Sequence, residues 1–174
     1  MAQDSTAAAG QNYLTITSLS ARQSFASLQL CGPSDQITLY MKEISSDGNI
    51  NTVDVIFPAH PLLVYTNPTL LKLLLDPLFE YQESGLYPNK WSMHDLGSHY
   101  PNATGHPDGS DESMPLEECG DMIIMSLLYA NRAGDTAFLS QHYPLLKQWI
   151  EYLIEEALYP ANQISTDDFA GSLS

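Results

Sequence analysis

The sequence predicts a mainly α-helical protein of stacked helical hairpins, with a short β-hairpin near residues 37–57. In the second half of the chain, apolar residues recur at helical spacing in segments joined by short connections, and helices joined in this way pack antiparallel. Earlier in the chain, β-branched residues alternate on both sides of a turn sequence, which is typical of paired strands. The 174 residues are 44% hydrophobic, enough to bury a core, so disordered and fibrous classes are excluded.

The N-terminal residues 1–12 are small and polar, and we expect them to form a flexible leader before a single domain over residues 13–174. Residues 13–30 partly follow helical spacing and predict a first helix, although their Ser and Thr content lowers helix propensity. Residues 31–36 form a turn cluster.

The predicted β-hairpin consists of residues 37–45 and 52–57, which flank the turn sequence Asp47-Gly48-Asn49. Both segments alternate apolar and polar residues and contain β-branched side chains. Pro58 is expected to end the second strand.

The first long helix of the bundle is predicted between Asn67 and Gly85. Asn67 is followed by Pro68, a pair that favours a helix start, and Gly85 is a stop signal. Pro77 lies inside this segment and should kink or divide the helix.

Two more long helices are predicted, one from Pro115 to Gly134 and one from Pro144 onward, with a short helical connection between them. We expect each to bury an apolar stripe. The stripe of the first contains Ile123, Ile124, Leu127 and Leu128, and that of the second contains Leu145, Leu146, Trp149, Ile150, Leu153 and Ile154.

A long polar segment from Trp91 to Gly120 is the predicted site region. A connection of this length is uncommon in a compact domain unless it has a function. It contains three histidines and six carboxylates: His94, His99, His106, Asp95, Asp108, Asp111, Glu112, Glu117 and Glu118.

Carboxylates beside breaks in the helical pattern are the candidate catalytic groups. Glu117 and Glu118 lie in the first turn of a predicted helix, where the helix dipole favours the charged form, and a simple helix-start role is the alternative. Asp95 could equally form an Asx turn. Asp167 and Asp168 could equally cap a following helix.

No metal ion or cofactor is expected from the sequence. The spacing of His94, His99 and His106 matches no compact ligand motif, and the acidic residues 108–112 lack the calcium-loop pattern. Cys31 and Cys119 lie far apart and imply no disulfide framework.

The formal net charge of −15 opposes binding to nucleic acid phosphates and to anionic membranes, so neither partner is expected. The opening residues lack the basic and apolar regions of a secretory signal, and no apolar run is long enough to cross a bilayer. Asn102 lies in a glycosylation sequon, which has meaning only for an exported protein.

Five blocks of sequence resemble the fungal extracellular glutaminase A family. In chain order they are KEISSDGNINTVDVIFPAHPLLVY, NPTLLKLLLDPLFEYQESGLYP, HDLGSHYPNATGH, PLEECGDMIIMSLLYA and YPANQISTDDFAG. The resemblance covers nearly everything after Gly10. It implies a six-hairpin glycosidase-like domain, an (α/α)6 toroid, preceded in the family by a β-rich domain. It also implies hydrolysis of L-glutamine to L-glutamate and ammonia outside the cell.

Two departures from the family pattern bear on these expectations. Family members are much longer, so the chain resembles only the first half of the toroid, and we expect exposed apolar helix faces and little activity from it alone. Asp121 stands where members of the family usually carry Asn.

The resemblance suggests site roles by analogy with other six-hairpin enzymes, which place acids at one mouth of the toroid. Glu117 or Glu118 is the expected general acid, and Asp95 or Asp168 the expected base. Trp91, His94, Tyr100 and Asp167 are the expected substrate-binding residues, with loop packing as the alternative for the rings. A six-hairpin glycoside hydrolase, or a non-catalytic truncated product, remains an alternative function.

Overall fold

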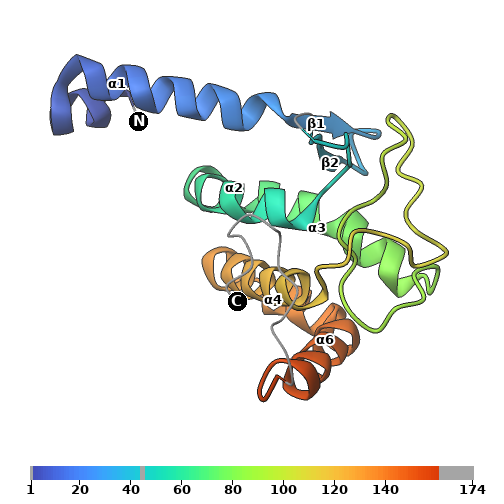
Figure 1. The fold of residues 1–174 in the computed structure, drawn as a ribbon. Helices are drawn as coiled ribbons and strands as arrows, with labels where there is room; N and C mark the ends of the chain where they lie inside the picture. Colours follow the sequence, from blue (N-terminus) through green and yellow to red (C-terminus); the bar gives the residue numbers. More distant parts are fainter. Residues whose placement is uncertain (1, 44–45, 161–174) are drawn as a thin grey trace, which may run out of the picture.

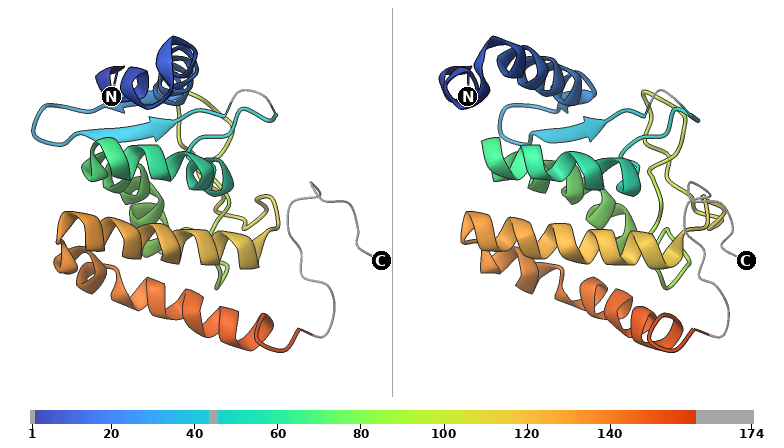
Figure 2. Two further views of the ribbon diagram at one scale, coloured as in Figure 1. Left: turned by 90° about the vertical axis from the view of Figure 1, so that its left-hand side faces the viewer. Right: turned by 60° about the vertical axis from the view of Figure 1, so that its left-hand side comes forward.

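The computed structural model describes residues 2–43 and 46–160, and it confirms the mainly α class (Figure 1). The elements are, in order, α1 (Ala2–Ala26), β1 (Leu28–Cys31), β2 (Thr38–Met41), α2 (Val53–Thr66), α3 (Pro68–Glu83), α4 (Pro115–Ala133), α5 (Thr136–Gln141) and α6 (Tyr143–Glu156). They stack in layers, with α1 and the two strands at one end, α2 and α3 next, then α4, and α6 at the other end (Figure 2).

The N-terminal region differs from the sequence prediction. Residues 2–12, predicted as a flexible leader, lie in α1, where the run of Ala residues favours helix. Non-helical backbone at Ala9 and Gly10, the latter with φ of 76°, divides α1 into two helical segments. The helix ends at Ala26. Residues 28–30, predicted as helix, and Cys31, predicted as the start of a turn, form β1 instead.

The β-hairpin is present, but its partner strand was predicted wrongly. β2 pairs antiparallel with β1, with Leu28 opposite Met41. The turn after β2 does bring Lys42 beside Ile50 in an isolated bridge, but residues 53–57 then begin α2 rather than a second strand. Val53 and Ile56 are fully buried at helical spacing, so burial on one helix face outweighs their β-branched propensity.

Asn51 fixes the point where the hairpin ends and α2 begins. It is fully buried and has a left-handed φ of 52°, which Asn tolerates better than most residues. Its Oδ1 accepts the Met41 N–H at 2.6 Å and its Nδ2 donates to the Leu74 carbonyl at 2.9 Å. Asn51 therefore ties β2 and α3 together at the start of α2.

Helices α3 and α4 begin as the sequence predicts. The side chain of Asn67 accepts the Thr69 N–H at 3.1 Å and caps α3. Pro77 does not divide α3. Gly134 ends α4 in the left-handed conformation, with φ of 68°.

The buried faces of α4 and α6 differ from the predicted stripes. Ile124 and Leu127 are each 50% exposed, whereas Met122 and Met125 are buried. In α6, Ile150 and Ile154 are exposed, and the buried residues are Leu146, Trp149 and Tyr152. Both helices carry apolar side chains on more than one face, so the sequence pattern alone did not select the buried one.

The segment between α3 and α4 packs beside the start of α2. The Leu96 N–H donates to the Ile50 carbonyl at 2.8 Å, and the Val53 N–H donates to the His94 carbonyl at 2.9 Å. These bonds hold residues 94–96 against the first turn of α2. Among the described helices, none combines the length and apolar character that crossing a lipid bilayer requires.

Candidate functional site

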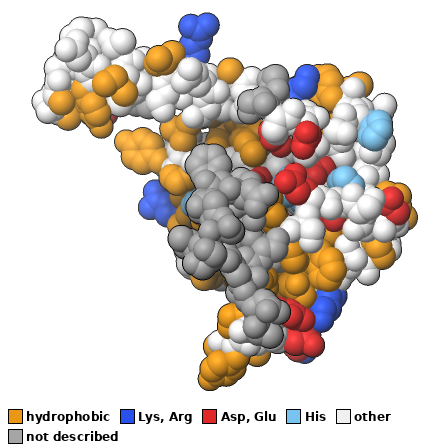
Figure 3. Space-filling model, viewed as in Figure 1, with side chains coloured by type: hydrophobic (Ala, Val, Ile, Leu, Met, Phe, Trp, Pro, Cys, Tyr) orange, Lys and Arg blue, Asp and Glu red, His pale blue; other side chains and the backbone are white. Residues whose placement is uncertain are grey.

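An acidic pocket lies where the first turn of α2 meets the segment between α3 and α4. Its volume is about 240 Å³. On this face of the molecule, acidic side chains gather near a histidine (Figure 3). The described residues that line the pocket are Glu43, Ser46, Asp47, Thr52, Asp54, Val55, His94, Glu112 and Met114, with neither a basic side chain other than His94 nor a Phe, Tyr or Trp ring.

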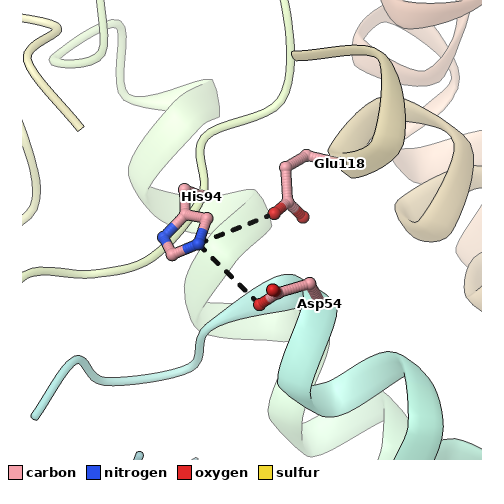
Figure 4. Close-up of side chains that lie close together, drawn as sticks. All are labelled: Asp54, His94 and Glu118. Atoms are coloured by element: carbon pink, nitrogen blue, oxygen red, sulfur yellow. Dashed lines mark ion pairs between the residues drawn. The ribbon is translucent and has the colours of Figure 1, made fainter. Parts of the chain in front are cut away.

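Three side chains from distant parts of the chain converge beside this pocket (Figure 4), and two of them, Asp54 and His94, line it. Asp54 comes from the first turn of α2, His94 from the long connection and Glu118 from the first turn of α4. The Nε2 of His94 lies 3.8 Å from Asp54 Oδ1 and 3.9 Å from Glu118 Oε1. One nitrogen or oxygen atom of each residue lies within 4.8 Å of those of the other two.

His94 is held from behind, so that Nε2 faces the two carboxyl groups. Its Nδ1–H donates to Asp95 Oδ2 at 2.7 Å, and its backbone N–H donates to Asp111 Oδ2 at 2.8 Å. Asp95 in turn accepts hydrogen bonds from His106 Nε2 at 2.8 Å and from the Gly97 N–H. Because Asp95 fixes the tautomer and the ring plane, Nε2 is the atom presented to the pocket.

This hydrogen-bond chain shifts the ionisation of both partners. Burial alone would lower the pKa of His94, but the hydrogen bond to Asp95 and the surrounding carboxylates raise it above its ordinary value. Burial would likewise raise the pKa of Asp95, but the hydrogen bonds from His94 and His106 hold it below its ordinary value. Both pKa shifts favour the charged forms, a carboxylate at Asp95 and an imidazolium at His94.

The carboxyl group of Glu118, unlike that of Asp95, accepts no hydrogen bond from the described residues. Glu118 is 0% exposed, and neither of its carboxyl oxygens has a hydrogen-bond partner among the described residues. Burial, and then the negative charges of Asp54 and Asp121, raise the pKa of Glu118 to about 11. A buried carboxyl group without donors either holds a proton or faces a cation.

Several predicted site residues lie near this pocket. His94 lines it, Glu118 belongs to the three-residue cluster, and Asp95 lies directly behind His94. Glu117 is half-buried and next to Glu118 in α4, and neither of these two residues is among the residues that line the pocket. Of the three loop histidines considered as metal ligands, His94 alone belongs to the cluster within residues 2–43 and 46–160.

Other predicted residues lie elsewhere. Trp91 packs against Tyr152, with ring centroids 5.5 Å apart. Tyr100 donates to Gln29 Oε1 at 2.7 Å, and neither aromatic ring lines the pocket. Asn102 is exposed, as its predicted glycosylation requires. Asp167 and Asp168 lie outside the described residues.

Asp54 is the residue that sequence reasoning missed. It follows Thr52 and Val53 in a stretch that was interpreted as a β-strand, where an acid on the exposed face has no special meaning. The helical spacing of Val53 and Ile56 with His60 and Leu63 was the available signal. Had it been followed, Asp54 would have been placed in the first turn of a helix, like Glu118.

Comparisons with known proteins agree with the family resemblance. Residues 10–174 match the model of the glutaminase A six helical-hairpin domain. The whole chain is 65% identical to a quarter (25%) of glutaminase A from Aspergillus oryzae. It also aligns with 27% of a probable glutaminase from Arthroderma benhamiae, at 40% identity over 230 aligned positions.

The chain thus spans about a quarter of the length of these relatives. No solved structure matches it significantly. The family match nevertheless covers nearly all of the chain, and it agrees with the helical hairpins seen in the structure. The chain belongs to the glutaminase A six helical-hairpin family.

Proposed function

We propose that this chain contributes the pocket around His94 to an enzyme that hydrolyses L-glutamine to L-glutamate and ammonia. Two relatives carry the name glutaminase or probable glutaminase. The single observation that supports this site is the convergence of Asp54, His94 and Glu118 from three segments of the chain. Such convergence at a cavity is typical of catalytic groups.

Amide hydrolysis needs a water molecule that is activated for attack on the carbonyl carbon, and a proton for the departing nitrogen. The pocket beside Asp54 and His94 is suited to hold that water. His94 Nε2 lies 3.8 Å from Asp54 Oδ1 and 3.9 Å from Glu118 Oε1, and the ligand atoms of the three residues lie within 4.8 Å of one another. We assign both steps to these three side chains together: the proton that they take from the water is passed to the departing nitrogen, so that glutamine and water become glutamate and ammonia.

Asp95 has a different role in this proposal. It hydrogen-bonds to His94 Nδ1, on the side of the ring away from the pocket, and it is a positioning residue rather than the base that the resemblance suggested. Glu117 lies next to Glu118 but does not belong to the cluster of Asp54, His94 and Glu118 in the described part of the chain. The proposed roles of Asp167 and Asp168 rest on the family resemblance alone.

The charge of the pocket suits an amino acid substrate. Glu43, Asp47 and Glu112 line it together with Asp54. Carboxylates at this density attract a positive group, and the α-ammonium of glutamine is such a group. The lining also disfavours a glycoside hydrolase, because sugar rings are commonly bound on aromatic faces and no Phe, Tyr or Trp ring is among the described lining residues.

A chimera tests this proposal. The matching quarter of Aspergillus oryzae glutaminase A is replaced by this chain, so that every substitution is made in the residues described above. We expect the chimera to release ammonia from glutamine. His94→Asn should reduce kcat/KM by about 100-fold or more, which is the size of effect expected when a general acid or base is removed. The circular dichroism spectrum of the variant should be unchanged. A folded chimera without turnover, or a fully active His94→Asn variant, would contradict the proposal.

A further inference from the structure

We propose that Asp54, His94 and Glu118 bind a divalent metal ion. Each residue offers one ligand atom, and the three atoms lie within 4.8 Å of one another. An imidazole nitrogen and two carboxylate oxygens are ligand types that Zn²⁺ and Mn²⁺ accept. Nothing in the family match or in the names of the relatives assigns a metal to these residues.

The distances from His94 Nε2 to the two carboxyl groups are close to those of a metal centre. Metal–ligand bonds of about 2.0–2.2 Å place neighbouring ligands of a tetrahedral ion about 3.4 Å apart. His94 Nε2 lies 3.8 Å from Asp54 Oδ1 and 3.9 Å from Glu118 Oε1. A contraction of a few tenths of an ångström would bring these two pairs to that spacing. The ligand atoms of Asp54 and Glu118 lie within 4.8 Å of each other, and rotation of the two carboxyl side chains would bring them closer.

The carboxyl group of Glu118 is the second and independent observation. It is fully buried, it points toward His94 and Asp54 (Figure 4), and neither of its oxygens has a hydrogen-bond partner among the described residues. A buried polar group without partners costs free energy. A cation between the three side chains would bind to this carboxylate directly and remove that cost.

The surroundings of His94 match the usual support of a metal ligand. A metal-bound histidine commonly donates its other ring N–H to a carboxylate, which fixes the ring orientation. His94 Nδ1 is 2.7 Å from Asp95 Oδ2. Asp95 is itself held by His106, whose Nε2 lies 2.8 Å from Asp95 Oδ1. Two layers of side chains thus orient the Nε2 atom.

The pocket beside the cluster fits a metal that reacts, rather than one that only stabilises the fold. Three protein ligands leave at least one coordination position for water or substrate, and the pocket of about 240 Å³ adjoins Asp54 and His94. Glu43 and Glu112 add negative charge at the same pocket, which attracts a cation. If the proposed function is correct, the ion would polarise the attacking water.

The ligand set selects among common ions. Ca²⁺ takes six to eight oxygen ligands, whereas this cluster supplies one nitrogen and two carboxyl groups. We therefore expect Zn²⁺ and Mn²⁺ to bind more tightly than Ca²⁺.

Isothermal titration of the purified, metal-stripped chain with ZnCl₂, MnCl₂ and CaCl₂ tests the site. We expect one saturable site for Zn²⁺ or Mn²⁺. Glu118→Gln should weaken metal binding by at least about tenfold, because mutation of a residue that only hydrogen-bonds to a metal ligand already lowers metal affinity by that factor. Glu117→Gln is the matched control, because it removes the same charge from the neighbouring position in α4 and should change affinity by less than about threefold.

Two results of this titration would overturn the proposal. Absence of saturable binding of all three ions would overturn the proposal, as would equal losses in the Glu117→Gln and Glu118→Gln variants, which would indicate only general attraction to an acidic protein. Electron spin-echo spectra of bound Mn²⁺ give a second measurement: coupling to an imidazole nitrogen is expected, and its persistence in His94→Asn would contradict the assigned ligand. These binding results do not depend on turnover, so the metal site and the proposed reaction can fail separately.

Discussion

The Nδ1 atom of His94 lies 2.7 Å from Oδ2 of Asp95, and Nε2 of the same ring faces Asp54 and Glu118. One imidazole thus connects a buried, hydrogen-bonded carboxylate to a buried carboxyl group that lacks hydrogen-bond donors among the described residues. The two sides of the ring have different tasks: Asp95 positions the histidine, and the pocket side presents it to a ligand.

Asp95→Asn tests the positioning role. The amide keeps the size of the side chain but removes the charge that orients the Nδ1–H of His94, so we expect Zn²⁺ or Mn²⁺ affinity of the chain to fall by about 10- to 100-fold. Titration calorimetry measures the affinity. Asp108→Asn is the control, because Asp108 is exposed in the same segment and its change should leave the affinity nearly constant. A wild-type affinity in Asp95→Asn would show that Asp95 does not position His94.

Asn51→Ala tests the junction between β2, α2 and α3. The change removes the acceptor of the Met41 N–H and the donor to the Leu74 carbonyl, and it places Ala at a φ of 52°. Loss of these two buried hydrogen bonds, plus this conformation, should lower the free energy of unfolding by about 2–4 kcal/mol. Urea unfolding measures the change. Asn102→Ala, at an exposed position, should have little effect on the free energy of unfolding. Similar losses of stability in both variants would contradict the role of Asn51 at this junction.

Gly105→Ala tests the packing of the site segment against α3. Gly105 has a φ of 63°, and a Cβ atom there would lie 2.0 Å from Tyr81 Cζ. Gly85 also has a positive φ, of 77°, but a Cβ there meets nothing within 4 Å. Gly85→Ala should therefore cost about 1–2 kcal/mol for the backbone conformation alone.

We expect Gly105→Ala to lower the free energy of unfolding by about 2 kcal/mol more than Gly85→Ala, since the overlap with the Tyr81 ring must be relieved by moving one of the two segments. Chemical denaturation of both variants gives the difference. Equal costs would mean that the segment does not pack on Tyr81 as described.

Asp121 predicts a specific pH dependence of stability. Burial, and then the charges of Glu117 and Asp54, raise the pKa of Asp121 to about 7, whereas an unfolded Asp ionises near a pKa of about 3.9. Stability from the neutral carboxyl group is fully present below the unfolded value and is lost as the pH rises toward the folded value. Between about pH 4 and pH 7, Asp121 should therefore make the protein less stable as the pH rises.

Asp121→Asn should remove this contribution and keep the shape of the side chain. At pH 8 we expect the variant to be more stable than the wild type by about 1–3 kcal/mol, and at pH 4 the difference should largely vanish. Thermal unfolding of both proteins across this range measures the effect. If the stabilities of the wild type and the variant differ by the same amount at all pH values, the pKa of Asp121 does not cause the difference.

The sequence predicted the elements whose ends carry strong local signals. Asn67-Pro68 and Pro115 start α3 and α4, and Gly134 ends α4, because caps and proline act within one turn of the helix. The sequence failed at α2, where Val53 and Val55 satisfy a strand pattern locally and burial against the rest of the fold decides for helix.

The residues of the site that lie beside local sequence signals were predicted, and the one that depends on contacts between distant segments was not. The long connection and the first turn of α4 could be identified as unusual, and these contain His94, Asp95 and Glu118. Asp54 could not, because its approach to His94 depends on backbone contacts such as Val53 N–H to the His94 carbonyl, at 2.9 Å. Such contacts join residues about forty positions apart in the chain, and no rule based on local residue spacing predicts them.

The most direct test of the central claim compares Glu118→Gln with Glu117→Gln in the glutaminase chimera, with kcat/KM for glutamine as the readout. Both variants lose one negative charge at adjacent positions of α4, but Glu118 alone belongs to the cluster with Asp54 and His94 in the described part of the chain. We predict a loss of about 100-fold or more for Glu118→Gln and less than about threefold for Glu117→Gln. Equal activity of the two variants, or a larger loss in Glu117→Gln, would contradict the account.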